Sequence, residues 1–105
     1  MVKVNYDQKW DVLYVYKEGE KAKFSIEALE NFVIDIGFDG EVVGLEIQNA
    51  SKTLKVTKNE LKNIKKAKIA TLIKNKIYGV ICSLQLEKTI LESELQLPTS
   101  ISKRM

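Results

Sequence analysis

Apolar and polar residues alternate with a period of two in several separate stretches of this sequence, and this alternation limits the possible folds more than any other feature. Residues 2–6 and 11–17 alternate and are rich in valine and tyrosine, with Asp-Gln-Lys-Trp between them. A period of two is typical of a β-strand with one buried face. The sequence therefore predicts a first β-hairpin here, followed by a short third strand at residues 23–26.

The segment DIGFDGEVVGLE, residues 35–46, allows two interpretations. Asp35, Asp39, Gly40 and Glu46 match an EF-hand calcium loop, but Gly37 stands where that loop needs an acid or an amide. The flanking residues also alternate with a period of two, whereas an EF-hand needs flanking helices. A two-residue Asp-Gly turn accounts for both the acids and the alternation, so we predict a hairpin rather than a calcium site.

The predicted hairpin has a definite register. Its apolar pairs are expected to share one face, and they are Ile36–Val43, Ile34–Leu45 and Phe32–Ile47. The opposite face is expected to carry Val33, Asp35, Val42 and Glu46.

A short helical region is predicted next. Residues 49–52 indicate a helical turn, and Thr57 and Glu60 have the spacing of a capping box. We therefore expect a helix over about residues 58–66 that buries Leu61 and Ile64.

The last third of the chain returns to a period of two and predicts a three-stranded antiparallel meander. Its turns are expected at residues 75–76 and 88–89. The expected pairs are Ile73–Tyr78, Thr71–Val80, Ile69–Cys82, Leu86–Leu91 and Cys82–Leu95. The expected apolar face holds Tyr78, Val80, Cys82, Leu84, Leu86, Leu91, Leu95 and Leu97, while Gln85, Glu92, Glu94 and Gln96 face water.

Together these elements predict an α+β fold of mostly antiparallel strands, with N-terminal hairpins, a short central helix and a C-terminal three-stranded meander. Length predicts a single domain over residues 1–98, because 105 residues are enough for one core. Its parts are a β unit (1–50), a helical connector (51–66) and the meander (67–98), followed by a flexible tail at 99–105. No apolar run is long enough to cross a membrane, so we expect a cytoplasmic protein with no membrane partner.

The scarcity of histidine and cysteine excludes several kinds of site. The chain has no histidine and one cysteine, so it cannot form a Cys/His zinc site or a Ser-His or Cys-His nucleophile pair. We expect no metal and no cofactor. Cys82 lies on the apolar face of its predicted strand, which indicates a small buried hydrophobe rather than a reactive thiol.

Half of the chain resembles a known family. The pattern consists of Tyr6-Asp7, Asp11 with Leu13-Tyr14-Val15, Val33-Ile34-Asp35, and the block from Gly40 through Val42-Val43-Gly44-Leu45-Glu46-Ile47 to Ala50-Ser51. Over about residues 2–52 it resembles the domain-of-unknown-function family 2283. The resemblance implies an antiparallel β fold and a possible protein partner, since some members are thought to act as antitoxins beside small toxin-like proteins. It implies no established chemistry.

The acids in this pattern are candidates for a carboxylate-based enzyme or a divalent-metal site. They are Asp7, Asp11, Asp35 and Glu46. The simpler interpretation is structural: Asp7 and Asp11 flank a hairpin turn, where aspartate accepts backbone N–H groups. Because no nucleophile is matched to these acids, we expect no catalytic residue.

Charge is distributed unevenly along the chain. Residues 1–51 carry five lysines and ten acids, whereas residues 52–76 carry nine lysines and only Glu60. The lysine segment could bind phosphates, with Lys58, Lys62, Lys65 and Lys66 as candidates, but it lacks the arginines and aromatics that read bases. This segment has two alternative interpretations. It is either a helix face that contacts only water or a basic surface that contacts the acidic N-terminal half of a neighbouring subunit.

Aromatic residues gather on the first hairpin, at Trp10, Tyr14 and Tyr16. They indicate either a recognition surface or a core or dimer interface, and we favour the second interpretation. Two sheets with one apolar face each must pack on each other or on a second copy. We therefore expect a non-enzymatic homodimer that acts through protein contacts, with nonspecific nucleic-acid binding as the alternative.

Overall fold

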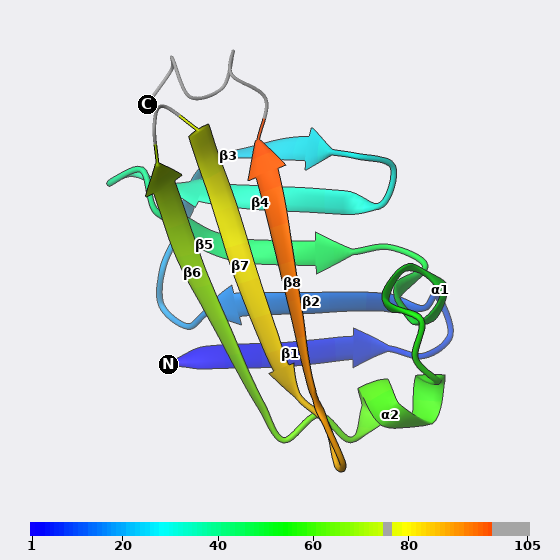
Figure 1. Cartoon of the computed structure of the whole chain (residues 1–105). Helices are drawn as coiled ribbons and strands as arrows, with labels where there is room; N and C mark the ends of the chain where they lie inside the picture. Colours follow the sequence, from blue (N-terminus) through cyan, green and yellow to red (C-terminus); the bar gives the residue numbers. More distant parts are fainter. Residues whose placement is uncertain (75–76, 98–105) are drawn as a thin grey trace.

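The structure, a computed structural model, describes residues 1–74 and 77–97 and contains two antiparallel β-sheets (Figure 1). The five-stranded sheet consists of β1 (Val2–Asp7), β2 (Val12–Lys17), β3 (Ala22–Ala28), β4 (Phe32–Gly37) and β5 (Val42–Ile47), in the order β1-β2-β5-β4-β3. Helices α1 (Ala50–Leu54) and α2 (Lys58–Lys62) lead to the three-stranded sheet of β6 (Lys66–Lys74), β7 (Ile77–Gln85) and β8 (Ile90–Leu97). The predicted α+β fold of mostly antiparallel strands is confirmed.

The two sheets pack face to face, and the strands of the smaller sheet cross those of the larger one at a steep angle (Figure 1). Their alternating sequences place every second side chain between the sheets, where apolar surface leaves water. The largest fully buried side chains are Leu13, Val15, Ile34, Ile36, Val42, Leu45, Ile47, Leu61, Val80, Leu84 and Leu86. One apolar layer therefore joins the two sheets, and each sheet keeps one outer face.

The two N-terminal hairpin units join through the pairing of β2 with β5. Leu13 lies opposite Ile47, and Val15 lies opposite Leu45, so both pairs contribute to the buried layer. The first hairpin has the predicted strands, and the predicted third strand is longer than expected. Pairing between β2 and β5 closes a long loop, which local alternation does not reveal.

The segment interpreted as a hairpin rather than a calcium loop does form the β4–β5 hairpin. The predicted pairs Phe32–Ile47 and Ile34–Leu45 are confirmed, but Ile36 pairs with Val42 rather than with Val43. The loop has three residues instead of two: the N–H of Gly40 donates to the Gly37 oxygen, and Gly40 has φ 86°. This combination is a type I turn followed by a left-handed residue, which shifts the register by one.

Because of this shift, the predicted position of Val42 is wrong. This residue was expected on the outer face, but it is fully buried, and its N–H donates to the Thr71 hydroxyl of β6 at 2.8 Å. Val43 packs over Gly37, where an added Cβ would lie 2.9 Å from the Val43 Cγ1. The absence of a side chain at Gly37 therefore makes room for the irregular pairing.

The C-terminal meander forms as predicted between β6 and β7, with Ile69 opposite Cys82, Thr71 opposite Val80 and Ile73 opposite Tyr78. Its predicted turn at residues 75–76 lies outside the described residues. The predicted register of β8 is wrong by two residues, because the turn is at Glu87-Lys88 and the N–H of Leu86 donates to the Thr89 oxygen.

A two-residue shift keeps every side chain on its predicted face. Leu84 therefore pairs with Leu91, Cys82 with Ser93 and Val80 with Leu95, in place of the predicted pairs Leu86–Leu91 and Cys82–Leu95. The predicted apolar residues of β7 are buried, and Gln85, Glu92, Glu94 and Gln96 are exposed.

The connector contains two short helices: α1 lies at the predicted helical turn, and α2 is shorter than the predicted helix. The predicted capping box is present: Thr57 accepts from the Glu60 N–H, and Glu60 accepts from the Thr57 N–H. Helix α2 ends at Lys62 rather than near residue 66, since Lys66 begins β6. Leu61 is buried and Ile64 is partly buried, as predicted.

Neither helix of the described chain is long and apolar enough to cross a membrane. The predicted tail at residues 99–105 lies outside the described residues, and the single-domain boundaries stay a prediction.

Candidate functional site

The outer face of the five-stranded sheet carries two rows of polar and aromatic residues. The strand registers align these rows across all five strands. One row is Lys3, Tyr16, Gly44, Asp35 and Ser25, and the next row is Asn5, Tyr14, Glu46, Val33 and Glu27. These side chains are partly or fully exposed, whereas Gly44 is buried beneath its neighbours. This surface is called the outer acidic face below.

A hydrogen-bonded set fixes the centre of the outer acidic face. The Tyr14 hydroxyl donates to Asp35 Oδ2 at 2.6 Å, and the Ser25 hydroxyl donates to Asp35 Oδ1 at 2.6 Å. Tyr14 reaches Asp35 across β5 because Gly44 has no side chain: an added Cβ would lie 2.7 Å from Asp35 Oδ2 and 2.8 Å from the Tyr14 hydroxyl. Gly44 therefore allows this contact between β2 and β4.

The electrostatics of this set keep Tyr14 neutral. Burial and the hydrogen bond to Asp35 raise the pKa of Tyr14 well above its usual value, so it stays a donor at neutral pH. The Tyr16 ring stacks on the Tyr14 ring, with 4.9 Å between centroids and 16° between planes. The centre of the face is thus a rigid aromatic and acidic surface.

A second aspartate organises the end of the sheet where β1, β2 and α1 meet (Figure 1). Asp11 is 9% exposed and accepts the Tyr6 hydroxyl at 2.7 Å and the Ser51 hydroxyl at 2.7 Å. The Ser51 N–H also donates to both carboxylate oxygens of Asp11, at 3.1 and 3.2 Å. The predicted structural role of Asp11 is therefore correct, although its N–H partner belongs to α1.

The same contacts change the pKa values of this cluster. Burial alone would raise the pKa of Asp11, but hydrogen bonds from Tyr6 and Ser51 and the charge of Lys58 outweigh it and lower that pKa. Burial and the bond to Asp11 raise the pKa of Tyr6 to about 12. Asp11 is therefore ionised and Tyr6 is protonated at neutral pH.

The structure separates the candidate acids into two groups. Asp7 is exposed at the β1–β2 turn, where it accepts the Trp10 N–H at 3.1 Å, and Asp11 lies beside it. Asp35 and Glu46 lie on the outer acidic face. Within residues 1–74 and 77–97, no three acidic or cysteine side chains gather in a metal-binding arrangement.

The other residues of the family-like pattern have structural positions. Leu13 and Ala50 belong to the core, and Gly40 supplies the left-handed turn residue. Ser25 and Tyr16 complete the outer acidic face but were not predicted as site residues. A glycine within a strand often marks the close approach of another group, so Gly44 was the available signal.

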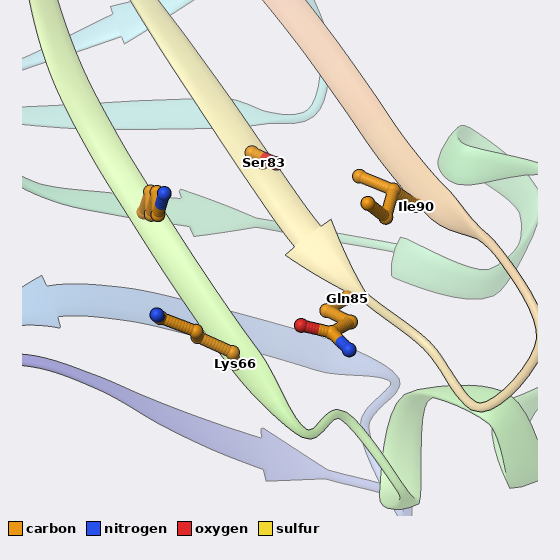
Figure 2. Close-up of a pocket in the computed structure, with 5 residues that line it drawn as sticks. Lys66, Ser83, Gln85 and Ile90 are labelled. Atoms are coloured by element: carbon orange, nitrogen blue, oxygen red, sulfur yellow. The ribbon is translucent and has the colours of Figure 1, made fainter.

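The lysine candidates do not form one compact patch on a single element. Lys58 and Lys62 lie on α2, and the Lys58 Nζ is 3.5 Å from the Gln8 oxygen. Lys65 follows α2, and Lys66 of β6 lines a shallow hollow of about 120 Å³ together with Lys68, Ser83, Gln85 and Ile90 (Figure 2). All four candidates are exposed.

The aromatic residues were predicted in the core or at a dimer interface; the core position is wrong, and the dimer interface stays a prediction. Trp10 is 68% exposed, with the Lys9 Nζ 5.5 Å from its ring, and Tyr14 and Tyr16 lie on the outer acidic face. Cys82 is buried as predicted, and burial raises the pKa of its thiol to about 11.

Comparisons with known proteins confirm the resemblance. Residues 3–51 match a family described as a protein of unknown function (DUF2283). An uncharacterized protein of Methanocaldococcus jannaschii is 48% identical over 60 residues, which are 57% of this chain and 51% of that protein. A putative hypoxanthine phosphoribosyltransferase of Methanosarcina mazei is 34% identical over 65 residues, 62% of this chain and 52% of that protein. The chain spans about half the length of these relatives, and no solved structure matches it.

Proposed function

We propose that this DUF2283-matching chain is a cytoplasmic, non-enzymatic interaction module that works as a homodimer and binds a basic protein through its outer acidic face. The family match covers β1 to β5 almost completely, so the outer acidic face lies within the matched region. The resemblance adds a partner class, a small toxin-like protein, for which the chain would act as an antitoxin.

The observation that carries the proposal is the composition of the outer acidic face. Glu27, Asp35 and Glu46 lie on three of its five strands, β3, β4 and β5, whereas the lysine of the two rows, Lys3, is on edge strand β1, with its Nζ 3.8 Å from the Glu18 carboxylate. Tyrosines are enriched in protein interfaces because they offer apolar area with a polar end. A face with net negative charge and two stacked tyrosines fits a lysine-rich or arginine-rich partner.

The hydrogen bonds at Asp35 support a non-enzymatic role. Both oxygens of this carboxylate already accept hydroxyl groups, from Tyr14 and Ser25. The raised pKa of Tyr14 also opposes its use as a base near neutral pH. These groups are suited to holding a shaped surface rather than to moving protons. The name of the Methanosarcina relative is not extended to this chain, because the aligned residues are 52% of that protein.

The proposal is tested by recovering partners with the tagged full-length chain and with a charge-reversed face, Glu27→Lys/Glu46→Lys. The matched control is Glu20→Lys/Glu87→Lys, which makes the same charge change at two exposed turn residues. We expect one stoichiometric basic protein with the wild type and with the control, and its loss with the face variant. Equal recovery with all three chains, or no protein partner at all, would contradict the proposal.

Nonspecific nucleic-acid binding is the second candidate, since Lys58, Lys62, Lys65 and Lys66 are all exposed. It predicts binding to single- and double-stranded DNA that weakens steeply with salt. Changing these four lysines to glutamate should abolish that binding, whereas Lys21→Glu, at an exposed lysine of the N-terminal half, should change it little. Binding that is weak at low salt and equal in both variants would eliminate this candidate.

A further inference from the structure

The outer face of the three-stranded sheet carries opposite charges on its two edge strands. This face turns away from the five-stranded sheet and toward the viewer in Figure 1. Lys66 and Lys68 project from β6, and Glu92 and Glu94 project from β8, and all four are exposed. The register places Lys68, Ser83 and Glu92 in one row across the sheet. This row therefore runs from a basic residue on β6 to an acidic residue on β8, and Lys66 and Glu94 add the same charges to their own strands.

Three apolar residues on this face, one from each strand, lie among the charged residues. Ile81 lies at the middle of β7 and is partly exposed, with Ala70 beside it on β6. Ile90 of β8 is 65% exposed and borders the hollow that Lys66, Lys68, Ser83 and Gln85 line (Figure 2). Exposed apolar residues among opposite charges resemble the composition of a protein interface more than that of a purely solvated surface.

From this pattern we infer that the outer face of the three-stranded sheet binds the same face of a second copy, about a two-fold axis parallel to β7. The inference rests on the homodimer in the proposed function and names its interface. A rotation of 180° about such an axis puts β6 of one copy over β8 of the other. Each Lys68 then faces Glu92 of the other copy, and the two Ile81 side chains meet at the axis.

The same rotation also places a side chain of the other copy over the hollow beside Lys66. Ile90 shares a row with Lys66 and Gln85, so the axis places Ile90 of one copy over Lys66 of the other. Its exposed side chain would fill the hollow of about 120 Å³ and bury apolar area on both copies.

Charge disfavours a two-fold axis perpendicular to the strands through the Lys68–Glu92 row. Such an axis would put β6 over β6, so that Lys68 would face Lys68 of the other copy and Glu92 would face Glu92. Like charges brought together across an interface are strongly unfavourable.

The test is sedimentation of the full chain over a wide concentration range, with single charge reversals and their mixture. Lys68→Glu creates two Glu–Glu contacts, and Glu92→Lys creates two Lys–Lys contacts. We expect either variant to weaken the dimer about tenfold or more at low salt. A mixture of the two variants should dimerise like the wild type. In the mixed dimer the introduced glutamate faces the introduced lysine at one contact, and the native Lys68 faces the native Glu92 at the other.

Matched controls make the same charge changes off this face, at Lys62 of α2 and Glu87 of the β7–β8 turn. Lys62→Glu, Glu87→Lys and their mixture should dimerise like the wild type. A wild-type dimer that Lys68→Glu and Glu92→Lys leave intact would overturn the inferred interface and leave the homodimer standing. A wild-type monomer at every concentration would overturn both the interface and the homodimer.

Discussion

Gly44 shows how one missing side chain shapes the outer acidic face. The glycine lies between Tyr14 and Asp35, and a methyl group there would come within 3 Å of both side chains. We predict that Gly44→Ala destabilises the protein by about 1–3 kcal/mol, because the added carbon pushes the two hydrogen-bonded groups apart. Chemical denaturation measures this change, with Asn5→Ala on the same face as the control. A loss no larger than that of the control would mean that Tyr14 moves aside freely.

Gly44 also explains why the Tyr14–Asp35 contact was not predicted. Alternation assigns Tyr14 and Asp35 to strand faces, but β2 and β4 do not pair, and β5 lies between them. Only the order of the strands and the open space over Gly44 bring the two groups together. The sequence shows the glycine, but it does not show which side chains from the neighbouring strands meet over it.

Asp11 connects two elements, the β1–β2 turn and helix α1, and it does so as an anion. Because hydrogen bonds lower its pKa in the folded chain, ionised Asp11 stabilises the fold above its unfolded pKa of about 4. That stabilisation is lost as the pH falls through the lower pKa of the folded state. We predict that Asp11→Asn costs about 1.5–3 kcal/mol at neutral pH and that the variant loses less stability on acidification.

The measurement is the free energy of unfolding as a function of pH for the wild type, Asp11→Asn and Asp7→Asn. Asp7→Asn is the matched control, because it makes the same change at an exposed aspartate of the same turn. If the free energy of unfolding changes with pH in the same way for the wild type and Asp11→Asn, the charge of Asp11 does not stabilise the contact between the turn and α1.

Turns are the elements that the sequence predicted least accurately. Strand positions follow from alternation, and a turn misplaced by one residue leaves every side chain of β8 on its proper face, so alternation alone cannot detect the error. The β4–β5 loop is different, since its extra residue turns Val42 inward. There, the register depends on the missing side chain at Gly37 and on the left-handed backbone conformation of Gly40. Helix α2 also ends earlier than predicted, because Lys66 belongs to β6 and pairs with Gln85 of β7.

The whole molecule depends on one shared apolar layer, since each sheet covers the inner face of the other. Leu84 of β7 is 2% exposed and belongs to the same core cluster as Ile34 and Leu45 of the larger sheet. We predict that Leu84→Ala destabilises both sheets equally, by about 2–5 kcal/mol, because the cavity lies in the layer between them. Amide hydrogen exchange of the slowest residues in β2, β4 and β7 measures the loss in each sheet separately.

Equal losses in the two sheets would establish one cooperative domain over the described chain, and they would have a consequence for the family-matching half. That half, residues 3–51, would then depend for its stability on β6–β8, which the family match does not include. Gln96→Ala, at an exposed residue of β8, should leave exchange unchanged in both sheets. Faster exchange in β7 alone after Leu84→Ala would instead mean that the five-stranded sheet is stable by itself and that the smaller sheet unfolds separately.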